Sequence, residues 1–249
     1  MNDRILYVYL IPGAVSNNRD ASNSEAPIAE IPSPQTPNTA SPVIFHDLTP
    51  ILFSDDELTA MIERVPHSGP MDIRSSITLP NRRLTESELE AWINEYNEMG
   101  GATAFELGVI REVNRVRERH GLHPLALSPA LMLSARFKAQ EFSNLQYYDH
   151  NSPIYGMPWE AARMFGVQGF VGENLTRTGS TGASVLRTTP ERIVEGMLAS
   201  DRGHRELLLD PNLYSVGFGI FFSPNSTGAR GNMSHMFYQV TQFEFISER

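Results

Sequence analysis

The amino-acid sequence predicts an α+β domain in which helices cover an antiparallel sheet. Residues 105–198 contain several amphipathic helical patterns, whereas two β segments, 214–222 and 236–245, end the chain. Helices that come first and a hairpin that comes last are typical of layered α+β domains, because each element must bury one apolar face against another. The chain has 249 residues, of which 41% are hydrophobic. A sizeable core is therefore expected.

Three segments are predicted before this domain. Residues 1–15 begin with a short apolar run, interpreted either as the remnant of a signal peptide or as a short strand. Residues 16–43 alternate proline with Ser, Asn and Ala, and we expect a disordered linker because so little apolar surface cannot offset the entropy of ordering. Residues 44–104 are predicted to form a helical accessory region, and residues 105–245 the main domain.

The accessory region contains two helical patterns. Residues 54–57, Ser-Asp-Asp-Glu, are a helix start, and the apolar face that follows stops at Pro66. Residues 85–88, Thr-Glu-Ser-Glu, match a capping box, and the apolar stripe behind them ends at Gly100. Neither helix carries residues that indicate chemistry, so both are expected to pack on the main domain.

Four further helical patterns and the two β segments make up the main domain. The first helix has its apolar face at 109–116 and closes at Gly121, and the second begins at Ser128 with a proline in its first turn. The third spans 158–165, and the fourth begins at Thr189, again followed by proline. In the last β segment apolar and polar residues alternate, as expected for a half-buried strand.

The composition excludes several classes of function. The net charge is −9, and lysine and arginine are not clustered, which argues against nucleic acid and against an electrostatic membrane anchor. The absence of cysteine excludes disulfides, thiolate zinc sites and cysteine nucleophiles. No stretch approaches the roughly 20 apolar residues that a membrane-spanning helix needs.

Six short motifs in the second half of the chain match, in order, those of one family. They are residues 114–127, 150–151 (His-Asn), 172–175 (Gly-Glu-Asn-Leu), 200–208 (with Ser-Asp-Arg-Gly-His-Arg), 216–219 (Val-Gly-Phe-Gly) and 241–243 (Thr-Gln-Phe). Each is weak alone, but their order and spacing resemble the CAP superfamily of cysteine-rich secretory, antigen 5 and pathogenesis-related proteins. The chain is most similar to the SCP-like extracellular members of bacteria.

The resemblance implies a three-layer α-β-α sandwich with a cleft on one face, lined in animal and plant members by two His and two Glu. Here His150 takes the first His position and Glu173 the first Glu position. The second Glu position falls on Ser200 and the second His position on Gln239, both departures from the family pattern. As in bacterial relatives, His204 is expected to supply an imidazole from a different backbone position.

Four more residues of the motifs are expected at the cleft. They are Asn151, Asn174, Arg205 and Gln242. For the last three a structural role is favoured, because buried polar side chains must be hydrogen-bonded whatever the function.

His150, Glu173 and His204 together suggest a metal as the cofactor. Two neutral imidazoles and one carboxylate are suited to Zn²⁺ with water in an open position, and such a site can activate water for hydrolysis. Against catalysis, the sequence has no His-Glu-x-x-His helix, no nucleophile elbow and no phosphate-binding glycine loop.

The sequence therefore favours a secreted or cell-envelope protein that binds a ligand in a His/Glu-lined cleft rather than an enzyme. The ligand is a lipid, a glycan, a protein or a divalent metal ion, and the partner a cell-surface component that the sequence does not identify. Two alternatives stay open. One is a metal-assisted hydrolase that uses the same cleft, and the other is a purely structural interaction module at the cell surface.

Overall fold

The structure is a computed structural model that describes residues 47–65, 73–180, 188–224, 227–228, 231–232 and 235–246. The predicted signal remnant and linker, residues 1–43, lie outside the described residues. Within the described part of the chain, no helix combines the length and the apolar character needed to cross a bilayer.

A four-stranded sheet forms the middle layer, in the order β1-β3-β6-β2. Its strands are β1 (Ala126–Leu127), β2 (Val171–Ser180), β3 (Leu213–Pro224) and β6 (His235–Phe245). Strand β6 pairs antiparallel with β3 on one side and with β2 on the other, whereas β1 runs parallel to β3. Both predicted β segments are thus confirmed, as neighbours. The short strands β4 (Thr227–Gly228) and β5 (Gly231–Asn232) pair separately.

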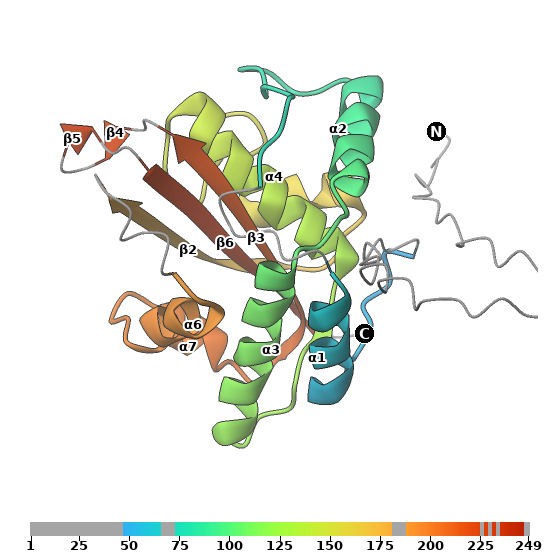
Figure 1. Ribbon diagram of the computed structural model, residues 1–249, viewed down its shortest axis with the longest axis vertical. Helices are drawn as coiled ribbons and strands as arrows, with labels where there is room; N and C mark the ends of the chain where they lie inside the picture. The colour runs from blue at the N-terminus through green and yellow to red at the C-terminus, as the bar shows by residue number, and fades with distance from the viewer. Residues whose placement is uncertain are drawn as a thin grey trace, which may run out of the picture.

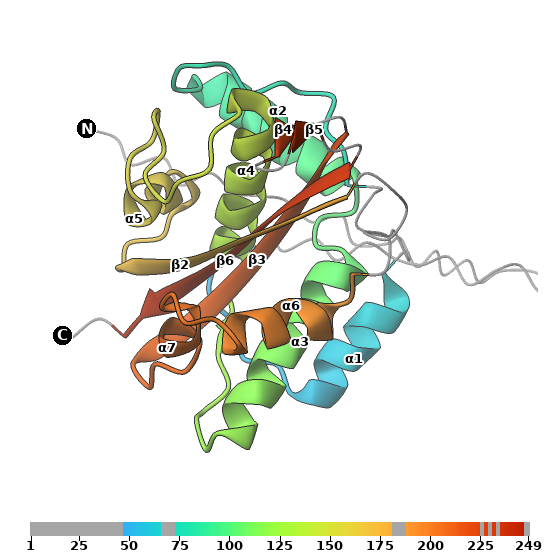
Figure 2. The ribbon, with the colours of Figure 1, turned by 90° about the vertical axis from the view of Figure 1, so that its left-hand side faces the viewer.

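Helices cover both faces of this sheet, which confirms the α-β-α sandwich (Figures 1 and 2). They are α1 (Asp55–Arg64), α2 (Glu86–Glu98), α3 (Ala104–Arg119), α4 (Pro129–Leu145), α5 (Pro158–Ala162), α6 (Pro190–Leu198) and α7 (His204–Leu208). On one face α4 lies against the sheet, with α2 and α5 beside it. On the other lie α3, α6 and α7, and α1 packs on α3.

The helix starts lie where the sequence predicts them, because local side chains satisfy the first backbone N–H groups. Ser54 and Thr85 form complete capping boxes at α1 and α2, and Ser128 caps α4 ahead of its proline. The pattern at 158–165 is shorter than predicted as an α-helix, since its last three residues, Arg163–Phe165, form a 3-10 turn that ends at Gly166 with φ 92°.

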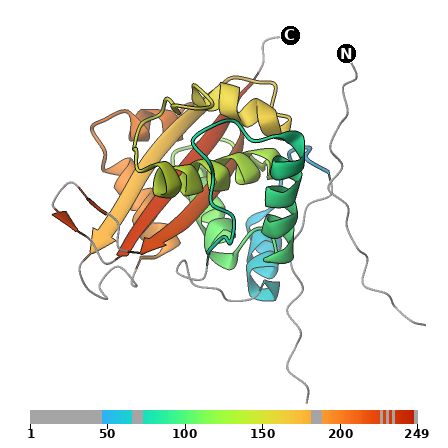
Figure 3. The same ribbon diagram turned by 90° about the horizontal axis from the view of Figure 1, so that it is seen from above.

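Helix α4 lies across the sheet (Figure 3), and the two approach each other very closely. A Cβ added to Gly217 would lie 2.3 Å from the carbonyl carbon of Leu131, and one added to Gly219 would lie 2.1 Å from the backbone nitrogen of Arg136. Only glycine fits at these two positions of β3. The Val-Gly-Phe-Gly motif therefore sets the distance between the helix and the sheet.

A buried ion pair joins α4 to α3. Arg136 Nε donates to Glu106 Oε1 at 2.7 Å, and the two side chains are only 3% and 0% exposed. Glu106 also accepts from the backbone N–H groups of Thr103 and Ile220, and the guanidinium lies 5.2 Å from the ring of Tyr96. The carboxylate thus links the start of α3, the sheet and α4 in one network.

Candidate functional site

Strand β2 presents different residues to the two helical layers, because side chains alternate along a strand. Glu173 and Arg177 lie on the α4 side, where Glu173 contacts His150 and the Arg177 guanidinium lies 4.5 Å from the ring centre of Tyr148. Asn174 lies on the other side, where its amide donates to the backbone carbonyl of His204 in α7 at 3.0 Å. β2 is also an outer strand of the sheet, so both sides are close to solvent.

His150 and Glu173 are in direct contact. Nδ1 of His150 lies 3.0 Å from Oε1 of Glu173, with the imidazole 49% exposed and the carboxylate completely buried. Because a carboxylate only accepts hydrogen bonds, Nδ1 carries the proton, and in the neutral ring Nε2 keeps its lone pair. The pair therefore orients an accessible imidazole whose second nitrogen is an acceptor.

The second oxygen of Glu173 is held by Gln242. The two residues are directly opposite in the β2–β6 ladder, and Gln242 Nε2 donates to Glu173 Oε2 at 3.0 Å. The amide oxygen of Gln242 is buried and has no hydrogen-bond partner in the described part of the structure. Gln242 thus fixes the carboxylate that fixes His150.

A buried lysine supports the loop that carries His150. Lys138 of α4 is 2% exposed, and its ammonium donates to the His150 carbonyl at 3.1 Å and to the Tyr147 hydroxyl at 2.9 Å. Burial lowers the pKa of Lys138, although Glu173 and Glu141 act in the opposite direction. The lysine places a positive charge beneath the site and anchors the backbone of His150.

Glu141 of α4 holds the two ends of the same loop. One oxygen accepts from the Tyr147 hydroxyl and the other from Ser152 Oγ, the latter at 2.6 Å. Burial and the neighbouring Glu141 carboxylate raise the pKa of Tyr147 well above its usual 10. His150 is therefore presented by a loop that is tied to one helix at three points.

His204 comes from the other helical layer, at the first position of α7, and is half-buried. Burial lowers its pKa below the usual 6.5, and the charges of His150 and Arg202 lower it further. The two histidines lie on opposite sides of β2, where His150 contacts Glu173 and the His204 carbonyl accepts from Asn174. We call His150, Glu173, Gln242 and His204 the histidine–glutamate site.

The remaining predicted residues have other positions. Ser200 closes the turn after α6 by accepting from the backbone N–H of Arg202 at 3.2 Å, and Arg205 donates to the Leu198 carbonyl at 3.3 Å. Asn151 is exposed. These contacts satisfy backbone groups and do not reach Glu173.

Gln239 does not join the histidine–glutamate site. Its amide oxygen accepts from Thr176 at 2.7 Å on the α6 side of the sheet. The match of Gln239 to the second His position stays a prediction, but Gln239 does not line the same face as Glu173, because Gln239 and Gln242 are three residues apart on one strand and face opposite ways. Gln242, for which a structural role was favoured, contacts Glu173 directly.

Within the described ranges, no three His, Asp or Glu side chains are grouped so that they could hold a metal ion. Both oxygens of Glu173 are already engaged, by His150 and Gln242. The described residues thus do not fit the zinc site that the sequence suggests. The arrangement they do fit is a hydrogen-bonded imidazole–carboxylate pair.

Sequence reasoning missed Lys138 and Glu141. A signal was present, because Lys138 and Glu141 interrupt the apolar stripe of α4 between Ala135 and Phe142. Charged residues among buried apolar ones are expected to be paired. What the sequence does not show is that their partners lie in the loop that follows the helix.

The family model for the cysteine-rich secretory protein family, CAP, matches residues 110–243 of this chain. The uncharacterised protein YkwD of Bacillus subtilis is 35% identical over 118 residues, which are 47% of this chain and 42% of that protein. The chain thus spans about two fifths of the length of this relative.

Two solved structures are similar to the chain at low identity. An extracellular protein of Bacillus anthracis that contains an SCP domain is 18% identical, with 66% of this chain and 45% of that one covered and a TM-score of 0.46. An outer surface protein of Borrelia burgdorferi is 16% identical, with 56% of this chain and 90% of that one covered and a TM-score of 0.41.

Proposed function

The chain belongs to the cysteine-rich secretory protein (CAP) family, and on that premise we propose that it binds a polar ligand outside the cell or in the cell envelope, with His150 as the recognition group. The secretory character in the family's description supports the location. The contact between His150 Nδ1 and the buried Glu173 carboxylate carries the rest of the proposal.

That contact holds the His150 ring in one orientation, so that its Nε2 is preorganised to accept a hydrogen bond. The ring is held by Glu173 on one side, while Lys138 holds its backbone, so little side-chain entropy is lost when a ligand arrives. The imidazole is 49% exposed, and its Nε2 accepts a hydrogen bond from a ligand hydroxyl or amide group. His204, kept mainly neutral by its lowered pKa, supplies a second imidazole nearby without adding positive charge.

Isothermal titration with chitotriose, a neutral glycan rich in hydroxyl and amide donors, tests this function. We expect saturable binding that His150→Ala weakens at least tenfold, because the acceptor is lost. Glu173→Gln should weaken it less, since the ring stays but its tautomer is no longer fixed. Phosphatidylglycerol vesicles, run in parallel, show whether a lipid takes the place of the glycan at the same residue.

His120→Ala is the matched control. His120 is also exposed, but its ring contacts the Val116 carbonyl at the end of α3. Binding of either probe that is lost with His150→Ala and kept with His120→Ala supports the proposal. Binding of neither probe, or binding indifferent to His150→Ala, rejects it in favour of a structural interaction module.

A hydrolase is the second candidate, and the same pair favours it, because an imidazole that donates to a carboxylate is the arrangement of a general base. Its metal-assisted form has no support from the described residues. If the site is hydrolytic, turnover of a peptide or glycoside substrate must fall at least a hundredfold in Glu173→Gln at unchanged thermal midpoint. Turnover that survives this substitution excludes the histidine–glutamate site as the catalyst.

A further inference from the structure

The opposite side of β2 has a hollow of its own. A pocket of about 350 Å³ lies between the β2–β6 part of the sheet and α6, within the range of about 300–1,000 Å³ that small-molecule sites occupy. Six of its lining residues carry the argument, and we call them the threonine pocket. They are Thr176, Thr178, Arg192, Ile193, Gly196 and Gln239.

The sheet supplies a floor of hydrogen-bonding groups. Thr176 and Thr178 are two residues apart on β2 and so face the same side, and Gln239 is opposite Thr176 in the ladder. Gln239 is only 2% exposed, and its amide nitrogen has a single long contact, 3.4 Å to Thr178 Oγ1. An amide nitrogen carries two protons. One donor of this buried side chain is therefore left for a ligand.

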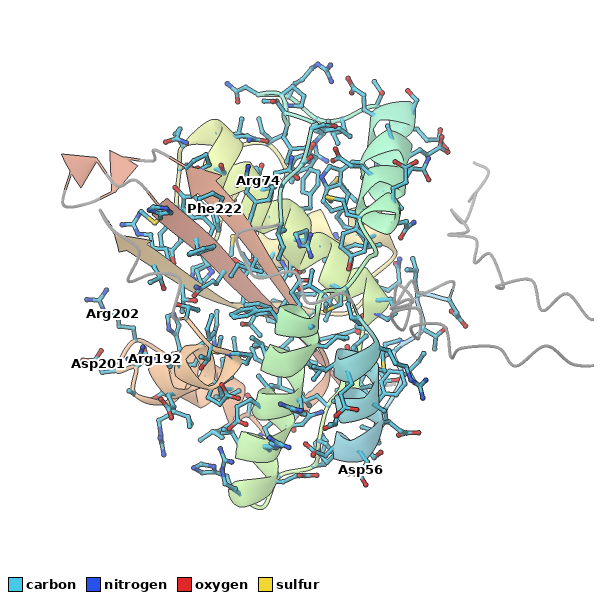
Figure 4. The ribbon with its side chains drawn as sticks, viewed as in Figure 1. Asp56, Arg74, Arg192, Asp201, Arg202 and Phe222 are labelled. Atoms are coloured by element: carbon cyan, nitrogen blue, oxygen red, sulfur yellow. The ribbon has the colours of Figure 1, made fainter. Side chains whose placement is uncertain are left out.

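Helix α6 supplies the charge of the pocket. Arg192 is the one charged residue among the eight described residues that line the pocket, and its guanidinium has no partner in the described part of the chain. Figure 4 shows it on the α6–α7 side of the protein, from which Arg202 also projects. A guanidinium presents a fork of donors that matches a carboxylate or a phosphate. The protein as a whole repels anions, since its net charge is −9. The unpaired guanidinium of Arg192, next to the polar side chains of the pocket, therefore attracts an anion to this place in particular.

The wall next to Arg192 is open. Ile193 is buried and gives an apolar side, whereas a Cβ added to Gly196 would meet no atom within 4 Å. The glycine therefore leaves room for a ligand at this point and is not required by close packing.

We propose that the threonine pocket binds a small sugar that carries one anionic group, a sugar acid or a sugar phosphate. Arg192 pairs with the anionic group, and Thr176, Thr178 and the Gln239 amide bond the ring hydroxyls. Ile193 packs against the apolar face of the ring. This site shares no residue with the histidine–glutamate site, and the sheet separates it from His150 and Glu173.

Titration with glucuronate, glucose 6-phosphate and glucose, followed by calorimetry, tests the assignment. At least one of the two anions is expected to bind about tenfold more tightly than glucose, because a charge-assisted pair with Arg192 is available only to them. The two anions distinguish carboxylate from phosphate as the preferred group. Arg192→Gln should remove this preference and leave any weak binding of glucose.

Gly196→Phe tests the location. The new ring fills the pocket from its open wall and should reduce binding at least tenfold, while the thermal midpoint stays within a few degrees of the parent because no atom is displaced. Arg202→Gln is the matched control, an exposed arginine on the same side that does not line the pocket.

His150→Ala should leave glucuronate and glucose 6-phosphate binding unchanged, which separates this site from the proposed function. Binding of glucose equal to that of both anions, or anion binding that persists in both Arg192→Gln and Gly196→Phe, overturns the proposal, as does the absence of binding by all three sugars.

Discussion

Two of the buried carboxylates described above are each hydrogen-bonded to one or two side chains from distant parts of the chain. Glu106 pairs with Arg136, and Glu173 lies between His150 and Gln242. Breaking such a pair leaves a charge in a medium that cannot solvate it, which is far more costly than breaking a surface pair.

Arg136→Met is therefore expected to destabilise the fold by about 3–5 kcal/mol, because it leaves the Glu106 carboxylate buried without its cation. Urea unfolding followed by circular dichroism measures the change. The double variant Glu106→Gln/Arg136→Met should recover much of the loss, since neither charge is then present.

Asp55→Asn is the surface control for this experiment. Asp55 accepts from Arg115 at 2.7 Å, but both side chains are about 40% exposed, at 42% and 38%. Its loss should cost at most about 1 kcal/mol. Equal effects of Arg136→Met and Asp55→Asn would show that the interior pair is not electrostatically important.

His204 makes stability depend on pH. Burial and two nearby positive charges lower its pKa in the folded protein below 6.5, so between that value and 6.5 the unfolded chain binds more protons than the native one. Stability then rises with pH through this window and is lost as the pH falls below about 6.5. His204→Gln should reduce the loss of urea midpoint between pH 7 and pH 5, compared with the parent. A loss that is unchanged or larger contradicts the lowered pKa.

At the scale of elements, the contact between α4 and β3 depends on two glycines, Gly217 and Gly219, which have only a hydrogen where every other residue has a Cβ. Gly219→Ala should destabilise the protein by about 1–3 kcal/mol or more, because the methyl group would overlap the backbone of α4 at Arg136. Gly196→Ala is the control, a helical glycine with open space around it, and should be neutral or slightly stabilising. Thermal unfolding of both variants measures the difference, and equal midpoints would mean that α4 can move away from the sheet.

Elements with local signals could be predicted from the sequence. The helix starts at Ser54, Thr85 and Ser128 depend on side chains that cap their own backbone, and β6 shows its alternation directly. The length of β2 could not be predicted, because Val171–Ser180 contains three glycines or serines and is a strand only through its ladder with β6. The complete burial of α4 from Pro129 to Phe142 likewise depends on layers that pack on both of its sides.

The candidate site was predicted in part. Motif resemblance identified His150 and Glu173, which the structure brings into contact. The same alignment of motifs did not show that Gln239 contacts Thr176 and not Glu173, since it carries no information on which face of a strand a residue occupies. Lys138 was missed because its partners lie in a loop whose path the sequence does not specify.

At the scale of the whole molecule, the predicted accessory region contributes directly to the core. Trp92 of α2 is 2% exposed, donates to Gln140 of α4 at 2.8 Å and packs edge-on against Phe137. The backbone N–H of Leu79 donates to the side-chain oxygen of Asn144 in α4 at 2.8 Å. We therefore expect residues 73–99 to unfold together with the sheet.

Trp92→Ala should cost about 3–5 kcal/mol and shift the whole unfolding transition, because a large buried ring is removed from the layer around α4. Differential scanning calorimetry should show one transition in both proteins. Met99→Ala, at the exposed end of α2, should change stability by no more than about 0.5 kcal/mol. A separate early transition in Trp92→Ala would instead mean that α2 is an independent appendage.

The position of β2 at the margin of the sheet has a consequence for how this protein can vary. Its odd-numbered residues, such as Glu173 and Arg177, and its even-numbered ones, Thr176 and Thr178, belong to separate surfaces. A substitution at an odd-numbered position changes one surface and leaves the other unaltered, and the reverse holds at an even-numbered position. A one-residue insertion ahead of Glu173 within the strand would interchange both sets at once, so natural relatives should differ here by replacement and not by length.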